Sequence, residues 1–297
     1  KECDWSSDVC SSDLTACIGA LPLRGEHLAY APNDGGLANA LIARMNSSTF
    51  HTALSVNLNK VALVRNTRHL GLPSVTRAAF LCLEAGAAGI TVHPRPDARH
   101  IRADDVFALA ELLKDWPDRE FNIEGNCREQ KFIDLVLEVR PDQVTLVPDA
   151  EGQITSDHGW DTLRFRDYLR EMIGTFKAAG IRTSIFCDPV IEMIEGAAET
   201  GTDRIELYTE QYARGFAGGT AQEAVAPYRA AATRAHELGL GINAGHDLDL
   251  QNLAFFKKSI PFLDEVSIGH ALISDSLYFG LQNTVQLYLR ELRKSFA

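Results

Sequence analysis

Short apolar runs alternate with longer segments of helical period from residue 54 to the end of the chain. Eight such runs are rich in β-branched and apolar side chains, and each is followed by an amphipathic stretch. This alternation is typical of parallel strands that are joined by helical crossovers. The expected strands are 54–58, 89–92, 120–123, 143–146, 182–186, 204–207, 240–243 and 262–268.

The segments between these strands carry apolar side chains at helical spacing. Val75, Ala79 and Cys82 share one face after a Pro73-Ser74 start. Further helices are expected within 106–113, 132–139, 165–176, 191–200, 221–238 and 250–257, and a last one ends near residue 292. With no linker inside 54–297, eight strand and helix units predict an α/β fold, a single (β/α)8 barrel of the TIM type.

The first 44 residues do not fit this pattern. Residues 4–14 have neither strand nor helix period and resemble the translation of a sequencing adapter. The first Met is Met45, shortly before the first expected strand. We therefore expect residues 1–44 to be a non-native or disordered extension and residues 45–297 to form the barrel, whose usual length is about 250 residues.

Composition and charge exclude several classes of protein. A formal net charge of −11 argues against a general nucleic-acid binder, which needs a basic face. No run of about 18 apolar residues predicts a membrane-spanning helix. Beyond residue 44 the cysteines are Cys82, Cys127 and Cys187, whose wide spacing and odd number favour free thiols in a reducing, cytoplasmic setting.

In a β/α barrel the functional side chains stand at the carboxyl ends of the strands and in the loops that follow them. Several polar residues are expected at these points, and they include four of the nine histidines. The candidates that we consider most informative are Asn57, Arg68, His93, Arg95, His100, Glu124, Thr155, His246, Gly269 and His270.

Each candidate has a functional and a structural interpretation. A single His after a strand is usually a loop or core residue, but four on one rim favour a functional role for His93 and His246. Glu124 ends an apolar strand, where partial desolvation would raise its pKa toward the range of general acid/base catalysis. The alternative for Glu124 is a salt bridge to a neighbouring arginine.

Anion binding is the second function that these positions suggest. Arg68 and Arg95 can hold a phosphate in bidentate fashion, although most arginines of an acidic protein only cover surface. Gly269 and His270 open the last helix, whose free N–H groups suit a phosphate. A metal site built from His93, Glu124, Asp188 and His246 is less favoured, because Arg95 would repel a divalent cation. No dinucleotide or Walker motif is present.

Taken together and in order, several motifs resemble the pyridoxine 5′-phosphate synthase family over roughly residues 54–292. The motifs are Ser55-Val56-Asn57-Leu58-Asn59, Thr91-Val92-His93-Pro94-Arg95 with Arg99-His100, Asn122-Ile123-Glu124-Gly125-Asn126, Leu146-Val147-Pro148, Asn243-Ala244-Gly245-His246-Asp247 and Ile268-Gly269-His270-Ala271. Residues 1–44 have no counterpart in this family.

The resemblance implies a transferase of vitamin B6 biosynthesis. Such an enzyme condenses 3-amino-2-oxopropyl phosphate with 1-deoxy-D-xylulose 5-phosphate to pyridoxine 5′-phosphate, phosphate and water, without a metal or organic cofactor. It also implies a homo-oligomer, an octamer in the family, in the cytoplasm. The implied roles are general bases for His93 and Glu124 and a proton donor for His246. The implied substrate ligands are Arg95 and His100 for the xylulose phosphate, and Asn57, Arg68, Thr155, Asp247, Gly269 and His270 for the amino-ketone phosphate.

The chain departs from the family pattern at three points. Asn59-Lys60 stands where one branch has Asp-His, Asp247 replaces a Gly of some members, and Cys127 stands where Pro is common. Two alternatives remain open. One is another phosphate-binding barrel, an aldolase or isomerase, although the expected strands lack the Lys of a Schiff-base aldolase. The other is a barrel that binds phosphorylated ligands without catalysis.

Overall fold

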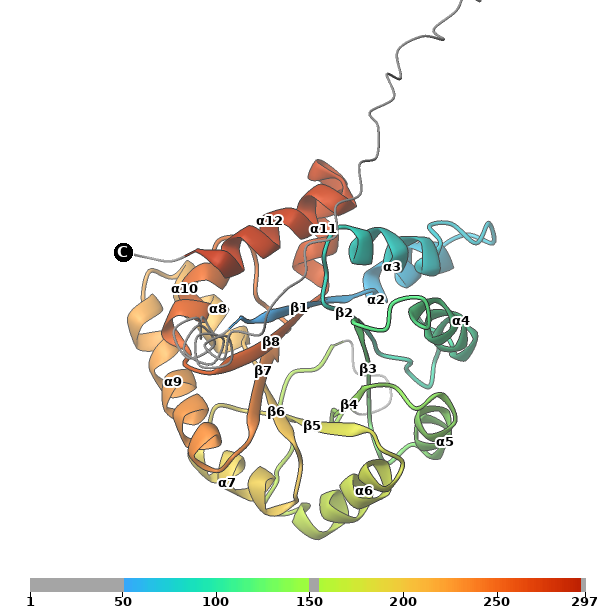
Figure 1. The fold of residues 1–297 in the computed structure, drawn as a ribbon. Helices are drawn as coiled ribbons and strands as arrows, with labels where there is room; N and C mark the ends of the chain where they lie inside the picture. Colours follow the sequence, from blue (N-terminus) through green and yellow to red (C-terminus); the bar gives the residue numbers. More distant parts are fainter. Residues whose placement is uncertain (1–50, 150–154, 295–297) are drawn as a thin grey trace, which may run out of the picture. The chain divides into compact units, whose positions relative to one another are not determined.

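The computed structural model describes residues 51–149 and 155–294, and the predicted barrel is confirmed in them. Eight parallel strands pair in chain order, and the pairing of β1 with β8 closes the ring, which lies inside a ring of helices in Figure 1. The strands are β1 (Ala53–Asn57), β2 (Gly89–Val92), β3 (Glu120–Gly125), β4 (Gln143–Leu146), β5 (Arg182–Cys187), β6 (Arg204–Leu207), β7 (Gly241–Gly245) and β8 (Leu263–Ile268).

The helices agree with the expected segments and add three features. The described helices are α2 (Asn59–Asn66), α3 (Val75–Glu84), α4 (Ala103–Leu113), α5 (Gln130–Val139), α6 (Arg166–Ala178), α7 (Ile191–Glu199), α8 (Glu210–Ala217), α9 (Ala221–Glu237), α10 (Leu253–Ser259), α11 (His270–Phe279) and α12 (Leu281–Arg293). The pattern of apolar positions did not predict α2 and α8. It also indicated one last helix where Gly280, at φ 77°, separates α11 from α12.

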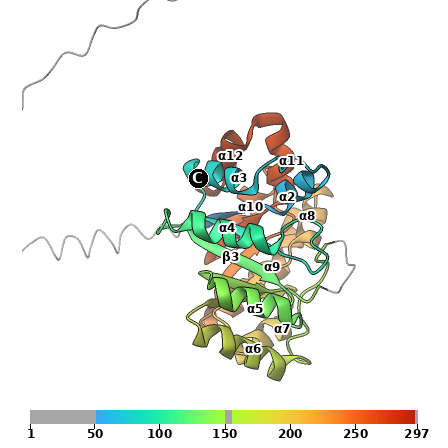
Figure 2. The same ribbon diagram turned by 90° about the vertical axis from the view of Figure 1, so that its right-hand side faces the viewer.

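The apolar core lies between the strands and the helices. Along β3, for example, Phe121 and Ile123 point outward and are buried under the helix layer, whereas Glu120, Asn122 and Glu124 alternate with them. The side view in Figure 2 shows α4, α5 and α6 following one another along the outside of the strands. Helix α3 begins at Ser74, whose Oγ accepts the N–H of Arg77 at 3.1 Å, as the predicted start requires.

The inside of the barrel is polar rather than filled with branched apolar side chains. Ser55 Oγ and Thr91 Oγ1 are 2.7 Å apart, and Asn122 donates to Thr91 at 3.4 Å while it accepts from Thr145 at 3.1 Å. These four buried side chains belong to β1, β2, β3 and β4. Because each of these four groups finds a partner on a neighbouring strand, this part of the interior can carry hydrophilic side chains.

Three other predictions concern cysteines, membranes and the first residues. Cys82, Cys127 and Cys187 are free and buried, as predicted, and burial raises the pKa of Cys82 and of Cys127 to about 12. No helix in the described parts of the chain is long and apolar enough to cross a membrane. The expected extension 1–44, with its adapter-like residues 4–14, lies outside the described residues.

Replacing Gly245 by Ala should destabilise the barrel by about 3 kcal/mol, because an added Cβ would stand 2.0 Å from the backbone oxygen of Ser267 on β8. Gly174 provides the control, since a Cβ there meets nothing within 4 Å in an exposed helical position. Gly174→Ala should raise stability by about 0.5–1 kcal/mol. Urea denaturation measures both, and equal stability of Gly245→Ala and the wild type would contradict the close approach of β7 and β8.

Candidate active site

A cavity of about 720 Å³ opens at the carboxyl ends of the strands. This volume is typical of sites for small molecules. Each of the eight strands, or the residues directly after it, contributes to the wall. The contributing residues in chain order include Asn57, His93, Glu124, Val147, Phe186, Glu206, His246 and Gly269.

Glu124 is buried at the floor of the cavity and is held from two neighbouring strands. Asn57 Nδ2 donates to Glu124 Oε2 at 3.2 Å, and His93 Nδ1 lies 3.9 Å from the same oxygen. Asn59, the first residue of α2, keeps both partners in place, because its Oδ1 accepts the His93 backbone N–H at 2.9 Å and its own backbone N–H donates to Asn57 Oδ1 at 3.0 Å. Asn59 therefore positions His93 through its side chain and Asn57 through its backbone.

Burial makes the charged forms of both His93 and Glu124 unfavourable. The pKa of Glu124 rises to about 8, first because of desolvation and then because of the neighbouring carboxylates Asp149 and Glu265. The pKa of His93 falls well below 6.5 through desolvation and the charges of Arg95 and His100. His93 and Glu124 stand at ion-pair distance, but the lowered pKa of His93 and the raised pKa of Glu124 favour a neutral imidazole beside a protonated carboxyl group. Such a pair can accept and return protons.

Glu206 of β6 adds a second buried carboxyl group to the cavity wall. It is 4% exposed, and its Oε2 has no hydrogen-bond partner in the described structure. Desolvation together with Glu124 and Glu265 raises its pKa well above 4.5. The alternation of side chains along β6 turns Glu206 toward the interior of the barrel.

His246 follows β7 at the opposite side of the cavity from β2 and β3. Its backbone has a positive φ of 27°, and Gly245 precedes it. Its Nδ1 is 2.7 Å from Asp247 Oδ2, and its Nε2 is 2.8 Å from Thr155 Oγ1. Asp247 and Thr155 thus orient the imidazole through its two ring nitrogens.

Three cationic side chains and one imidazole line the wall that follows β2. Arg95, Arg99, His100 and, from α2, Lys60 all face the cavity. His100 Nδ1 accepts the Ile101 N–H at 2.9 Å, and burial with the charge of Arg95 lowers the pKa of His100 to about 4. His100 is therefore neutral with its proton on Nε2, and this N–H can be donated to an anion.

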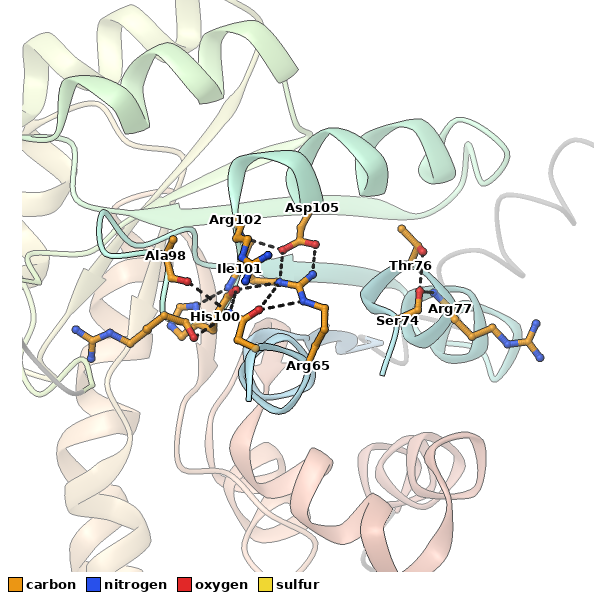
Figure 3. A network of polar contacts seen from close by, with 11 residues as sticks. Arg65, Ser74, Thr76, Arg77, Ala98, His100, Ile101, Arg102 and Asp105 are labelled. Carbon is orange, nitrogen blue, oxygen red and sulfur yellow. Dashed lines mark hydrogen bonds and ion pairs between the residues drawn. The ribbon is translucent and has the colours of Figure 1, made fainter. Parts of the chain in front are cut away.

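An ion pair between α2 and α4 holds this wall from outside, and Figure 3 shows it. Arg65 pairs with Asp105 of α4, and its Nη2 also donates to the His100 carbonyl oxygen at 3.2 Å. Asn66 donates to the same oxygen at 2.8 Å. Asp105 in turn accepts the Arg102 N–H at 2.9 Å, at the start of α4. The unpredicted helix α2 thus fixes the loop that carries Arg95 and His100.

The structure brings together ten of the eleven residues that the sequence analysis named. Arg68 is the exception, since it is exposed in the turn after α2 and does not line the cavity. The residues that line it are Asn57, His93, Arg95, His100, Glu124, Thr155, His246, Asp247, Gly269 and His270. The backbone of Gly269 lies close to the Asn57 side chain, because a Cβ added at Gly269 would stand 3.1 Å from it. The individual roles of these residues stay predictions.

Lys60, Arg99 and Ser156 also line the cavity, although the sequence did not assign them to the site. Lys60 follows one of the quoted motifs and Arg99 belongs to another, so their position and charge were the available signal. The rival metal interpretation included Asp188, which instead accepts the Gly159 N–H at 3.3 Å. Within the described residues, no group of three or more His, Cys, Asp or Glu could hold a metal ion.

The fold and the cavity define a TIM-barrel protein with acid/base groups and cationic groups in one site at the carboxyl ends of its strands. Comparison with family models matches residues 54–294 to the pyridoxal phosphate biosynthesis protein PdxJ. The chain belongs to this family.

Curated relatives agree with this assignment. The chain is 62% identical over 242 residues to pyridoxine 5′-phosphate synthase of Christiangramia forsetii, a match that covers 82% of this chain and 100% of the relative. It is 58% identical over 243 residues to the synthase of Cytophaga hutchinsonii, with the same coverage. Among solved structures, a tryptophan synthase from M. tuberculosis superposes with a TM-score of 0.57 at 13% identity, covering 86% of this chain and 98% of that one. That likeness shows the fold alone.

Glu124→Gln should flatten the pH dependence of stability. The pKa of Glu124 is about 8 in the folded protein against an ordinary 4.5, so the native state keeps a proton that the unfolded chain releases between these values. Stability therefore falls as the pH rises through this window. At about pH 8 the variant should be more stable than the wild type by at least about 1 kcal/mol, and at about pH 4 the two should agree. Urea denaturation at both pH values decides, and a variant that is less stable at pH 8 would contradict the buried proton.

Proposed function

We propose that this chain condenses 3-amino-2-oxopropyl phosphate with 1-deoxy-D-xylulose 5-phosphate to form pyridoxine 5′-phosphate, phosphate and water. The relatives that match over their whole length carry the name of this synthase. The observation that carries the proposal in this chain is the meeting of His93, Glu124 and His246 with Arg95 and His100 in one cavity.

The reaction needs protons to be moved at several atoms of the growing ring. The amine of one substrate and the ketone of the other form an imine with loss of water, a phosphate leaves, and an aldol-type closure with dehydration completes the ring. Acid/base groups on different sides of one cavity suit this sequence. We assign proton abstraction to His93 and Glu124 and proton donation to His246.

The pKa of Glu124 supports a role that depends on protonation. With a pKa of about 8, the carboxyl group holds its proton at neutral pH and releases it at little cost. His93 is neutral and can accept a proton through its free lone pair. Asn57 donates a hydrogen bond to Glu124. A substrate that displaces this contact can change whether His93 or Glu124 carries the proton.

The charges around the site support two phosphorylated substrates on a chain of net charge −11. Arg95 and the Nε2–H of His100 would hold the xylulose phosphate on the β2 side. Gly269 and His270 open α11, whose N–H groups would face the phosphate of the amino-ketone, with Asn57, Thr155 and Asp247 nearby. We keep Arg68 as a proposed ligand of that phosphate, although it lies off the cavity wall in this structure.

We also propose that the chain acts in the cytoplasm as a homo-oligomer, with the octamer as the state expected from its family. The buried free thiols support a reducing compartment. Leu277 and Tyr278 at the end of α11 are 80% and 83% exposed, and such apolar surface is typical of subunit contacts. Analytical ultracentrifugation tests the assembly, and a monomer at micromolar concentration would contradict it.

Incubation of the purified chain with both substrates tests the activity. Pyridoxine 5′-phosphate should appear by fluorescence and mass spectrometry, and one equivalent of phosphate should be released per product. Binding of both substrates without product would reject the synthase in favour of a binding barrel. Turnover of either substrate alone would instead favour the aldolase or isomerase alternative.

His246→Ala should lower kcat by roughly 10²–10⁴-fold, the usual contribution of a positioned proton donor. The KM values should change by less than about threefold, because His246 is assigned to proton transfer rather than to the binding of phosphate. Steady-state kinetics measures both, with His51→Ala as the control because His51 is exposed before the start of β1. Unchanged kcat in His246→Ala would refute the assignment.

A further inference from the structure

Asp149 is a buried carboxylate near the site that the proposed chemistry does not use. It stands three residues beyond the end of β4 and is 7% exposed. Its Oδ2 forms an ion pair with Nη2 of Arg95, the arginine assigned to the xylulose phosphate. Arg95 lines the main cavity whereas Asp149 lines a smaller cavity of about 240 Å³ that shares Arg95 as a wall. Asp149 can therefore act on the main cavity through Arg95.

We propose that Asp149 is a positioning residue that orients Arg95 for turnover and at the same time weakens the binding of the phosphate that Arg95 holds. The inference rests on the proposed function, because it assigns a substrate phosphate to Arg95. It concerns a residue that belongs to neither the acid/base set nor the anion ligands.

Asp149 is itself held from three parts of the chain. Ser156 Oγ donates to Asp149 Oδ2 at 2.9 Å, and Asn126, after β3, donates to the Asp149 backbone carbonyl oxygen at 2.8 Å. With Arg95 from the β2 loop, which pairs with the carboxylate, these contacts join three neighbouring strand ends at one residue. A group fixed in this way can fix its partner, since the flexible guanidinium otherwise has several rotamers.

The charge of Asp149 has a second consequence. Burial raises the pKa of Asp149, and Arg95 and Ser156 act against this increase, so the carboxylate depends on the arginine for its ionised form. A phosphate that reaches Arg95 places a second anion near the same guanidinium. Repulsion between the two anions in a poorly solvated site weakens phosphate binding. Asp149 thus favours the orientation of Arg95 but lowers the affinity for phosphate. The isosteric variant Asp149→Asn can separate the two effects, because it removes the charge and keeps an acceptor oxygen.

The contacts of the neighbouring residue connect this pair to His246. Ser156 holds Asp149, and Thr155, directly before it, is 2.8 Å from His246 Nε2. Arg95 and the proposed proton donor thus lie at the two ends of one short chain of contacts. A change at Asp149 should consequently affect turnover as well as binding.

Asp149→Ala and Asp149→Asn test the proposal, with Asp157→Ala as a control because Asp157 is exposed in the same loop and pairs with His158. Calorimetric titration with 1-deoxy-D-xylulose 5-phosphate and with inorganic phosphate measures affinity, and steady-state kinetics measures kcat. Both Asp149 variants should bind xylulose phosphate roughly threefold to tenfold more tightly than the wild type. Asp149→Ala should lose at least roughly tenfold in kcat, whereas Asp149→Asn, which keeps an acceptor oxygen for Arg95, should stay within about threefold.

Three results would overturn the proposal: weaker or unchanged binding by Asp149→Asn, equal losses of kcat in the two variants, or a loss in Asp149→Ala no larger than in the control. If Asp149→Ala does not fold, the affinity and kcat of Asp149→Asn decide alone. Absence of product from the wild type rejects the synthase and with it the assigned orientation for turnover. The titrations then still show whether Asp149 weakens anion binding at Arg95.

Discussion

Closure of the barrel by β1 and β8 is the constraint on which the site depends. The register sets Val56 against Ile268, so the ends of the first and last strands meet although more than 200 residues separate them. Asn57 then touches Glu124 on one side and lies against Gly269 on the other. A shift of this register would separate the floor of the cavity from the start of α11. The acid/base pair and the proposed phosphate site are therefore parts of one closed ring.

Closing a ring of eight strands around polar side chains has an electrostatic cost. Glu124, Glu206 and Glu265 are all inside, and burial raises the pKa of each, to about 8 for Glu124 and about 7 for Glu265. Arg204 offsets part of this cost at the bottom, 3.3 Å from Glu265, but no cation pairs with Glu124 or Glu206 among the described residues. Buried carboxyl groups without a cationic partner lower stability when they are ionised. Their retention at the floor of a cavity is understandable where protons must be exchanged near neutral pH.

The loops provide the cationic side chains of the site, whereas the strands provide buried carboxyl groups. Ion pairs hold these loops in place. Helix α2 holds the β2 loop through Arg65 and Asp105, and the residues after β4 hold Arg95 through Asp149. The cationic wall is thus fixed from two sides while the acid/base groups are fixed by the strands. The charged side chains thus lie on loops that are held by ion pairs, whereas the strands of the barrel determine the geometry of the acid/base groups.

Much of this arrangement could be predicted from the sequence, because each strand of the barrel shows a short pattern of apolar and polar residues that can be recognised without knowing the rest of the fold. The alternation of side chains in segments such as Glu120–Gly125 determines which residues face inward. Because all strands of the barrel are parallel, the polar residues at their carboxyl ends lie on the same rim. Helices α2 and α8 were not predicted, because α2 buries only Val61 and Ala62 and α8 only Tyr212, too few apolar positions to show a helical period. Only the tertiary structure decided that Arg68 lies off the cavity, that Asp149 pairs with Arg95 and that Glu124 is flanked by other carboxyl groups. These facts depend on distances between side chains far apart in sequence, and pKa values follow from such distances rather than from residue type.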